Sequence, residues 1–144
     1  MKRKVMLSIQ GKQFYQDQEP EIIELVTEGE MAFRGGGWDI SYKESELTGL
    51  AGVTTTFRVE PQKITLIRTG ALRSTMEFQI GDSHDSLYQM EFGTLMLTVT
   101  TKHLFFDILP EGGCIDLVYD IEIEKTQGGT VEYHLDIRPI EENA

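Results

Sequence analysis

The sequence predicts an all-β protein, a single antiparallel up-and-down barrel of about eight to ten strands that occupies residues 1–144. Apolar and polar side chains alternate with a period of two along most of the chain, as is typical of strands with one buried face. Short turns separate the alternating segments, so each strand is expected to pair with the next, without the long connections of Greek-key folds. Because closure removes the exposed edges of such a sheet, we favour a closed barrel over a two-layer sandwich.

The first half of the chain supplies five alternating segments. The apolar positions of the first three are Val5, Leu7 and Ile9, then Ile23, Leu25, Met31 and Phe33, then Trp38, Ile40 and Tyr42. The fourth and fifth segments, 54–61 and 63–70, are joined by a turn at 60–62, where a proline presets the backbone and cannot donate to a strand ladder. The stretch 41–52 is the one helix-like candidate and is expected to hold a short helical turn.

The second half begins with four further segments. Segments 74–81 and 86–93 are expected to pair across a turn that is rich in glycine and aspartate. Segments 94–100 and 103–109 meet near Thr101–Lys102, where the apolar phase changes from odd to even positions. A change of phase places the next side chains on the opposite face, so it predicts a tight turn or a β-bulge.

The last two segments have the most regular alternation. Their apolar positions are Ile115, Leu117, Tyr119, Ile121 and Ile123, followed by Val131, Tyr133, Leu135 and Ile137. The stretch 125–130 is predicted to be their hairpin turn, with its glycines supplying positive φ angles. The whole chain therefore holds about eleven alternating segments, most of them linked by short turns.

The chain is strongly acidic, with 24 acidic and 13 basic residues and a formal net charge of −11 at pH 7. Such a surface repels phosphate backbones, so nucleic acid is not an expected partner. From residue 110 onward, nine acidic residues stand against two basic ones. We interpret this excess as a solvated face and, alternatively, as a docking surface for a basic protein partner. The carboxylates of this acidic outer face on the two last segments are Asp116, Asp120, Glu122, Glu132 and Asp136.

The cellular location is predicted from three observations. The single cysteine, Cys114, has no partner for an internal disulfide and is expected to be a small strand residue. The N-terminus begins with basic residues, but its apolar run is shorter than the roughly 7–15 residues of a signal-peptide core. No stretch approaches the ~20 apolar residues of a membrane span. We therefore expect a cytoplasmic protein that does not associate with membranes.

Residues for catalysis or metal binding are not evident. His84 lies in a turn, His103 at a hairpin and His134 on an exposed strand face, so no two share metal-ligand spacing. His103 and Asp107 fall on one strand face, but no nucleophile is marked near them. The glycine runs open no helix and are interpreted as turns rather than phosphate-binding loops. We predict no metal, no cofactor and no catalytic residue, and enzymatic activity is the least favoured interpretation.

Two polar residues interrupt an apolar strand face and mark the candidate site. Arg68 and Ser74 share the phase of Leu66, Met76 and Phe78. A buried guanidinium is costly unless it is paired and hydrogen-bonded. It could anchor an anion or carboxylate inside a ligand cavity, or it could lie at a strand end with its head on carbonyls or an aromatic face. With the inward-phase aromatic residues, the candidate pocket residues are Trp38, Tyr42, Arg68, Ser74, Tyr88 and Tyr119.

The order of motifs resembles a known family. Residues 41–81 contain an Arg-x-Gly followed by a strand with "MEF", residues 88–104 a tyrosine strand, "FG" and a threonine-rich strand, and residues 112–124 "IDLVYD". These stretches resemble the YwiB-like family, small bacterial proteins of unknown function, with similarity over roughly 4–140. The resemblance implies a calycin-like, lipocalin-related β-barrel and brings no catalytic residues. The stretch 36–38 has the local form of the lipocalin Gly-x-Trp motif, but it lies on the third segment rather than the first.

Two hypotheses for the function follow. The first is a non-enzymatic barrel that binds a small, partly apolar molecule in its interior, with an acidic group held by Arg68. The second is a protein–protein interaction module with a solid core that uses the acidic outer face. The state of the barrel interior around Arg68 discriminates between them, because only the first hypothesis requires a cavity there.

Overall fold

Ten antiparallel strands make up the residues that the computed structural model describes, 2–15, 18–45 and 50–140. The strands are β1 (Lys2–Tyr15), β2 (Glu21–Arg34), β3 (Gly37–Lys43), β4 (Val53–Glu60), β5 (Lys63–Gly70), β6 (Leu72–Phe78), β7 (Ser83–Met90), β8 (Gly93–Leu109), β9 (Gly112–Ile123) and β10 (Thr126–Pro139). No helix that could cross a lipid bilayer occurs in these ranges. The predicted all-β class is confirmed.

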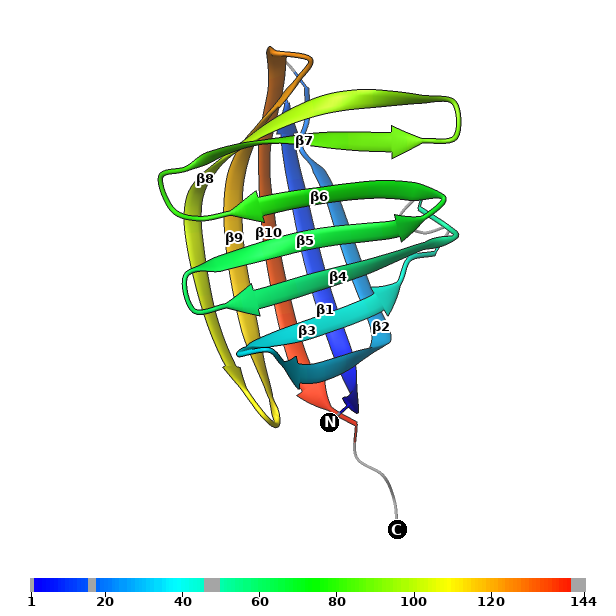
Figure 1. Cartoon of the computed structure of the whole chain (residues 1–144), viewed down its shortest axis with the longest axis vertical. Helices are drawn as coiled ribbons and strands as arrows, with labels where there is room; N and C mark the ends of the chain where they lie inside the picture. Colours follow the sequence, from blue (N-terminus) through cyan, green and yellow to red (C-terminus); the bar gives the residue numbers. More distant parts are fainter. Residues whose placement is uncertain (1, 16–17, 46–49, 141–144) are drawn as a thin grey trace.

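The strands close into a ring. Each strand pairs with its neighbours in the chain, and β10 returns to pair with β1, from Val5 opposite Pro139 to Tyr15 opposite Gly129. Long strands β1, β9 and β10 run along the barrel, while β3 to β6 cross in front of them (Figure 1). The predicted up-and-down barrel is confirmed, and its shortest pairing is that of β6 with β7, where Leu72 lies opposite Met90 and Arg73 opposite Gln89.

Strand β8 explains why the chain has ten strands rather than the eleven segments counted from alternation. It runs unbroken over 17 residues and pairs with β9 on both sides of a register shift between Thr101 and His103. The change of apolar phase there is a β-bulge, which adds one residue to a strand without ending it. Of the two predicted alternatives, a turn or a bulge, the structure has the bulge.

The β9–β10 hairpin differs from its prediction. The residues with positive φ are Glu124 and Lys125, not glycines. Gly128 and Gly129 lie within β10, where an added Cβ would collide with the carbonyl oxygens of Ile121 and Phe14. These glycines therefore permit close approach of neighbouring strands rather than forming the turn.

The helix-like stretch 41–52 is described only in part, so the short turn predicted within it is untested at residues 46–49. Residues 41–43 belong to β3, and residues 46–49 lie outside the described ranges. Two apolar residues near strand ends keep the phase of inward positions and are nevertheless exposed: Phe33 is 54% exposed and Ile80 is 63% exposed. Ile80 follows the end of β6, and Phe33 lies beside the β2–β3 turn. At such positions the alternation of a strand no longer decides which side chains face the interior.

The core fills one half of the barrel. On each strand that contributes to it, the fully packed positions occupy one end and the residues around the cavity described below occupy the other. The packed positions are Val5, Leu7, Met31, Ile40, Phe57, Val59, Ile64, Leu66, Phe78, Val99, Ile115, Leu117, Leu135 and Ile137. Burying one such side chain contributes about 1.5–3 kcal/mol, so this solid half can hold the fold together. The other half is free to be hollow.

Candidate ligand-binding cavity

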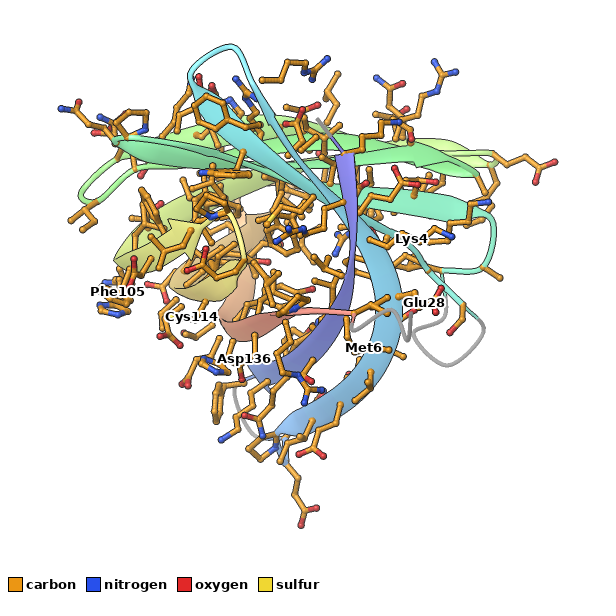
Figure 2. The ribbon with its side chains drawn as sticks, turned by 90° about the horizontal axis from the view of Figure 1, so that it is seen from below. Lys4, Met6, Glu28, Phe105, Cys114 and Asp136 are labelled. Carbon is orange, nitrogen blue, oxygen red and sulfur yellow. The ribbon has the colours of Figure 1, made fainter. Side chains whose placement is uncertain are left out.

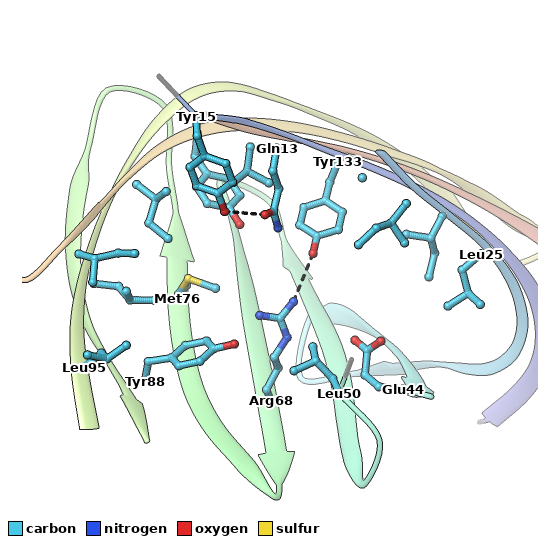
Figure 3. A pocket seen from close by; sticks show the side chains of 18 of the residues that line it. Gln13, Tyr15, Leu25, Glu44, Leu50, Arg68, Met76, Tyr88, Leu95 and Tyr133 are labelled. Atoms are coloured by element: carbon cyan, nitrogen blue, oxygen red, sulfur yellow. Dashed lines mark hydrogen bonds between the residues drawn. The ribbon is translucent and has the colours of Figure 1, made fainter. Parts of the chain in front are cut away.

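A cavity of about 370 Å³ occupies the half of the barrel beyond the packed core (Figure 3). This volume lies within the roughly 300–1,000 Å³ of small-molecule sites, toward the lower end. Its lining residues are Ile9, Gly11, Gln13, Tyr15, Ile23, Leu25, Tyr42, Glu44, Leu50, Arg68, Met76, Tyr88, Leu95, Leu97, Tyr119, Ile121, Ile123, Val131 and Tyr133. Apolar walls with a few polar groups are typical of sites for small organic molecules.

Arg68 is the positively charged group among the described residues of the cavity lining. It faces inward because β5 alternates, and it stands opposite Thr55 of β4 and Ser74 of β6. Its residue surface is only 8% exposed. One terminal nitrogen, Nη2, donates a hydrogen bond to the Tyr133 hydroxyl at 3.2 Å, while the buried Nε has no hydrogen-bond partner. Within the described ranges, no carboxylate forms an ion pair with this guanidinium.

The tyrosines around Arg68 are neutral hydrogen-bonding groups. Burial raises the pKa of Tyr42, Tyr88 and Tyr119 above the usual value, and for Tyr42 the nearby Glu44 carboxylate raises it further. A phenol can donate or accept a hydrogen bond but, while protonated, does not neutralise a cation. These tyrosines therefore supply no counter-charge to Arg68, and the carboxylate among the described residues of the cavity lining is that of Glu44.

Glu44 is a cavity residue that the sequence reasoning did not select. It is buried, and its Oε2 accepts a hydrogen bond from the Thr55 hydroxyl at 2.5 Å. The missed signal is its phase, because Glu44 continues the inward positions of Ile40 and Tyr42 by two residues. It lies in the stretch for which a helical turn was predicted, so that phase was not extended. Gln13, Tyr15 and Tyr133 also line the cavity without having been selected.

Four of the six predicted pocket residues line the cavity, and the other two, Trp38 and Ser74, do not. The four lining residues are Tyr42, Arg68, Tyr88 and Tyr119. Trp38 is outside the lining; it packs against the core and meets the Phe33 ring edge-on, with ring centroids 5.0 Å apart. Ser74 is buried beside the cavity, and its hydroxyl has no hydrogen-bond partner.

The outer wall of β9 and β10 carries the predicted acidic face. Cys114 and Asp136 pair across these strands and lie on the outer side of the barrel (Figure 2). His134 lies between two of its carboxylates, Asp116 Oδ1 at 2.5 Å from Nδ1 and Asp136 Oδ2 at 3.1 Å from Nε2. The hydrogen bond to Asp116 raises the pKa of His134, and this effect outweighs the partial burial of the imidazole, which lowers the pKa. In the part of the chain that is described, no group of three or more His, Cys, Asp or Glu side chains could hold a metal ion.

The fold and the cavity define a class of protein: a closed ten-strand up-and-down barrel that is solid at one end and hollow at the other. The model of the family described as a domain of unknown function, DUF1934, matches residues 7–137, and the chain belongs to this family.

Two comparisons with one relative, one of sequence and one of structure, support the same assignment. The chain is 29% identical over 128 residues to the uncharacterised β-barrel protein YwiB of Bacillus subtilis (strain 168), covering 88% of this chain and 89% of that protein. It is also similar to the crystal structure of the ywiB protein from Bacillus subtilis, with a TM-score of 0.86 and 25% identity over 97% of this chain and 94% of that one. The predicted resemblance to the YwiB-like family is confirmed.

Proposed function

We propose that this protein is a non-enzymatic binding protein that holds a small, partly apolar acid in the hollow half of its barrel. The observation that carries the proposal is Arg68, a buried cation that forms no ion pair with a carboxylate of the described residues and that lines a cavity of about 370 Å³. Removing an ion from water costs on the order of several kcal/mol, and one phenol hydroxyl offsets only part of that cost. An acidic ligand supplies the missing counter-charge and accepts charge-assisted hydrogen bonds from the guanidinium.

The rest of the ligand is inferred from the walls of the cavity. Isoleucine, leucine, methionine and valine side chains make up about half of the lining, and five tyrosines supply most of its aromatic surface. Such walls favour a hydrocarbon or aromatic body over a strongly polar one, because polar groups without partners lose hydrogen bonds on entering. No nucleophile with an adjacent base is found among the described lining residues, which favours binding over catalysis.

The alternative function, an interaction module for a basic protein partner, stays a prediction, as do a calycin-like classification and a cytoplasmic location. Two features argue against the alternative. It assumed a solid core, whereas half of the interior is hollow. Part of the acidic face is also engaged internally, because Asp116 and Asp136 contact His134 and Asp120 pairs with Lys102 at 3.3 Å.

Native mass spectrometry of protein purified without denaturation tests the proposal. We expect the wild-type protein to carry a small organic acid whose mass disappears in denaturing solvent. The Arg68→Met variant is expected to carry less of it, and Arg138→Met, which changes an exposed arginine of β10, is the matched control. A retained base, a molecule equally abundant in Arg68→Met, or wild-type protein without any retained molecule would each count against the proposal.

A further inference from the structure

The hydrogen bond between Arg68 and Tyr133 crosses the barrel interior. Arg68 belongs to β5 and Tyr133 to β10, which stand opposite each other in the ten-strand ring, with four strands between them on either side. The bond therefore divides the cavity into a side toward β6 to β9 and a side toward β1 to β4, and on the latter side the lining comes from β1, β2, β3, Glu44 and Leu50. In Figure 3, Met76 and Leu95 lie on one side of the bond, and Leu25 lies on the other.

The two sides of the cavity differ in charge. The β1–β4 side contains the Glu44 carboxylate, which comes directly after the end of β3. The β6–β9 side contains no charged group among the described residues of the lining, which there are Met76, Tyr88, Leu95, Leu97, Tyr119, Ile121 and Ile123. An anion on the first side would be repelled by Glu44, whereas on the second side it meets Arg68 and neutral walls.

The orientation of the guanidinium agrees with this difference. Nη2 is engaged by Tyr133, and the other terminal nitrogen points away from that bond, toward the side where Tyr88 and Met76 lie (Figure 3). A single guanidinium neutralises one negative charge, and a second charge would have to face apolar side chains. The geometry therefore selects for one acidic group bound at Arg68 and an uncharged body beyond it.

We infer that the ligand is a compact monocarboxylate whose acid group binds Arg68 from the β6–β9 side and whose apolar body lies along β6 to β9. This inference rests on the proposed function, since it assigns the position and the charge of the acid that the proposed function requires. The Arg68–Tyr133 hydrogen bond then forms the boundary of the ligand site, and the Glu44 side of the cavity remains outside it.

A matched pair of filling substitutions tests which side the ligand occupies. Leu95→Trp adds bulk on the β6–β9 side, and Leu25→Trp adds the same bulk on the β1–β4 side; both leucines are partly buried and line the cavity. With octanoate as the probe in isothermal titration calorimetry, Leu95→Trp is expected to weaken binding at least about tenfold and Leu25→Trp less than about threefold. Octanedioate, which adds a second carboxylate to the same chain length, is expected not to bind the wild-type protein.

A measurement on the unsubstituted protein covers the case in which a variant does not fold. With ¹³C-labelled methyl groups, octanoate is expected to shift the Leu95 and Met76 resonances and to leave those of Leu25 and of Met31, in the packed core, nearly unchanged. Larger effects at Leu25, equal effects of both tryptophan variants, or binding of octanedioate comparable to octanoate would overturn the inference while leaving the proposed function standing. If the wild-type protein binds no monocarboxylate at all, the proposed function itself fails.

Discussion

Burial of the Arg68 guanidinium costs stability, and the same buried charge can bind an anion. The Arg68 Nε is buried without a partner, and within the described residues the hydrogen bond of its side chain goes to the hydroxyl of Tyr133. Replacing a poorly compensated buried charge with an apolar side chain of similar volume is often neutral or stabilising. The presence of such a residue beside a cavity is therefore what the proposed binding function predicts. The unpartnered hydroxyl of Ser74, opposite Arg68 on β6, belongs to the same costly region.

His134 gives a pH dependence at the scale of a single residue. Its contacts with Asp116 and Asp136 raise its pKa above the usual value of about 6.5. A raised pKa means that the stabilisation is fully present below the unfolded-state pKa and is lost as the pH rises through the folded-state pKa. We expect His134→Gln to lower the free energy of unfolding by up to about 1 kcal/mol at about pH 5, since the pair is half exposed, and by less at about pH 8.5.

Urea unfolding of both proteins at the two pH values checks this expectation. A cost of the substitution that is the same at both values, or larger at the alkaline one, would show that the imidazolium does not stabilise the outer wall of β9 and β10.

At the scale of the strands, the seam between β10 and β1 closes the barrel and depends on glycine. Gly129 pairs with Tyr15 of β1, and a Cβ at this position would collide with the Phe14 carbonyl oxygen. Gly129→Ala is therefore expected to destabilise the protein by about 1–3 kcal/mol, as overpacking does in tightly fitted sites. Gly93→Ala is the matched control, because an added Cβ there meets no atom within 4 Å.

Chemical denaturation of the two alanine variants measures the difference directly. Equal stabilities for Gly129→Ala and Gly93→Ala would mean that the close approach of β10 to β1 is not a tight constraint on closure.

Alternation of side chains predicted the strands well where each strand has one face in the interior. Leu117 and Leu135, on the two most regular strands, are both buried as expected. Prediction failed where local geometry breaks the period. The bulge after Thr101 was counted as a possible strand end, because a change of phase alone does not distinguish a turn from one added residue. Phe33, beside the β2–β3 turn, is exposed although its phase is that of a buried position.

The candidate site was predictable only in part, because alternation shows which side chains face inward but not which of them meet across the barrel. The inward phase of Arg68 was visible from its neighbours on β5 and β6. Its contact with Tyr133 was not, because it joins residues 65 positions apart across the barrel, and alternation carries no information on which residues meet there. Glu44 was missed since a buried carboxylate at a strand end adds nothing to an apolar pattern.

At the scale of the whole molecule, the barrel separates stability from binding. Side chains that are almost fully buried fill one half, while the other half encloses about 370 Å³ of space. Packed interiors normally contain few voids larger than a water molecule, so a cavity of this size forgoes stabilising contacts. The packed half of the barrel compensates for that loss of contacts. In the hollow half, Arg68 lines the cavity and can contact a bound molecule.

The central claim, that this cation holds an acid inside the barrel, is tested most directly by titration calorimetry with octanoate and octanol, which share a chain length and differ in charge. A hydrogen bond to a charged group contributes about 1.5–3 kcal/mol, so we expect the wild-type protein and Arg138→Met to bind octanoate at least about tenfold more tightly than octanol. Arg68→Met is expected to lose this preference and to bind both weakly. Equal affinities of the wild-type protein for the two probes, or a preference for octanoate that survives in Arg68→Met, would contradict the claim.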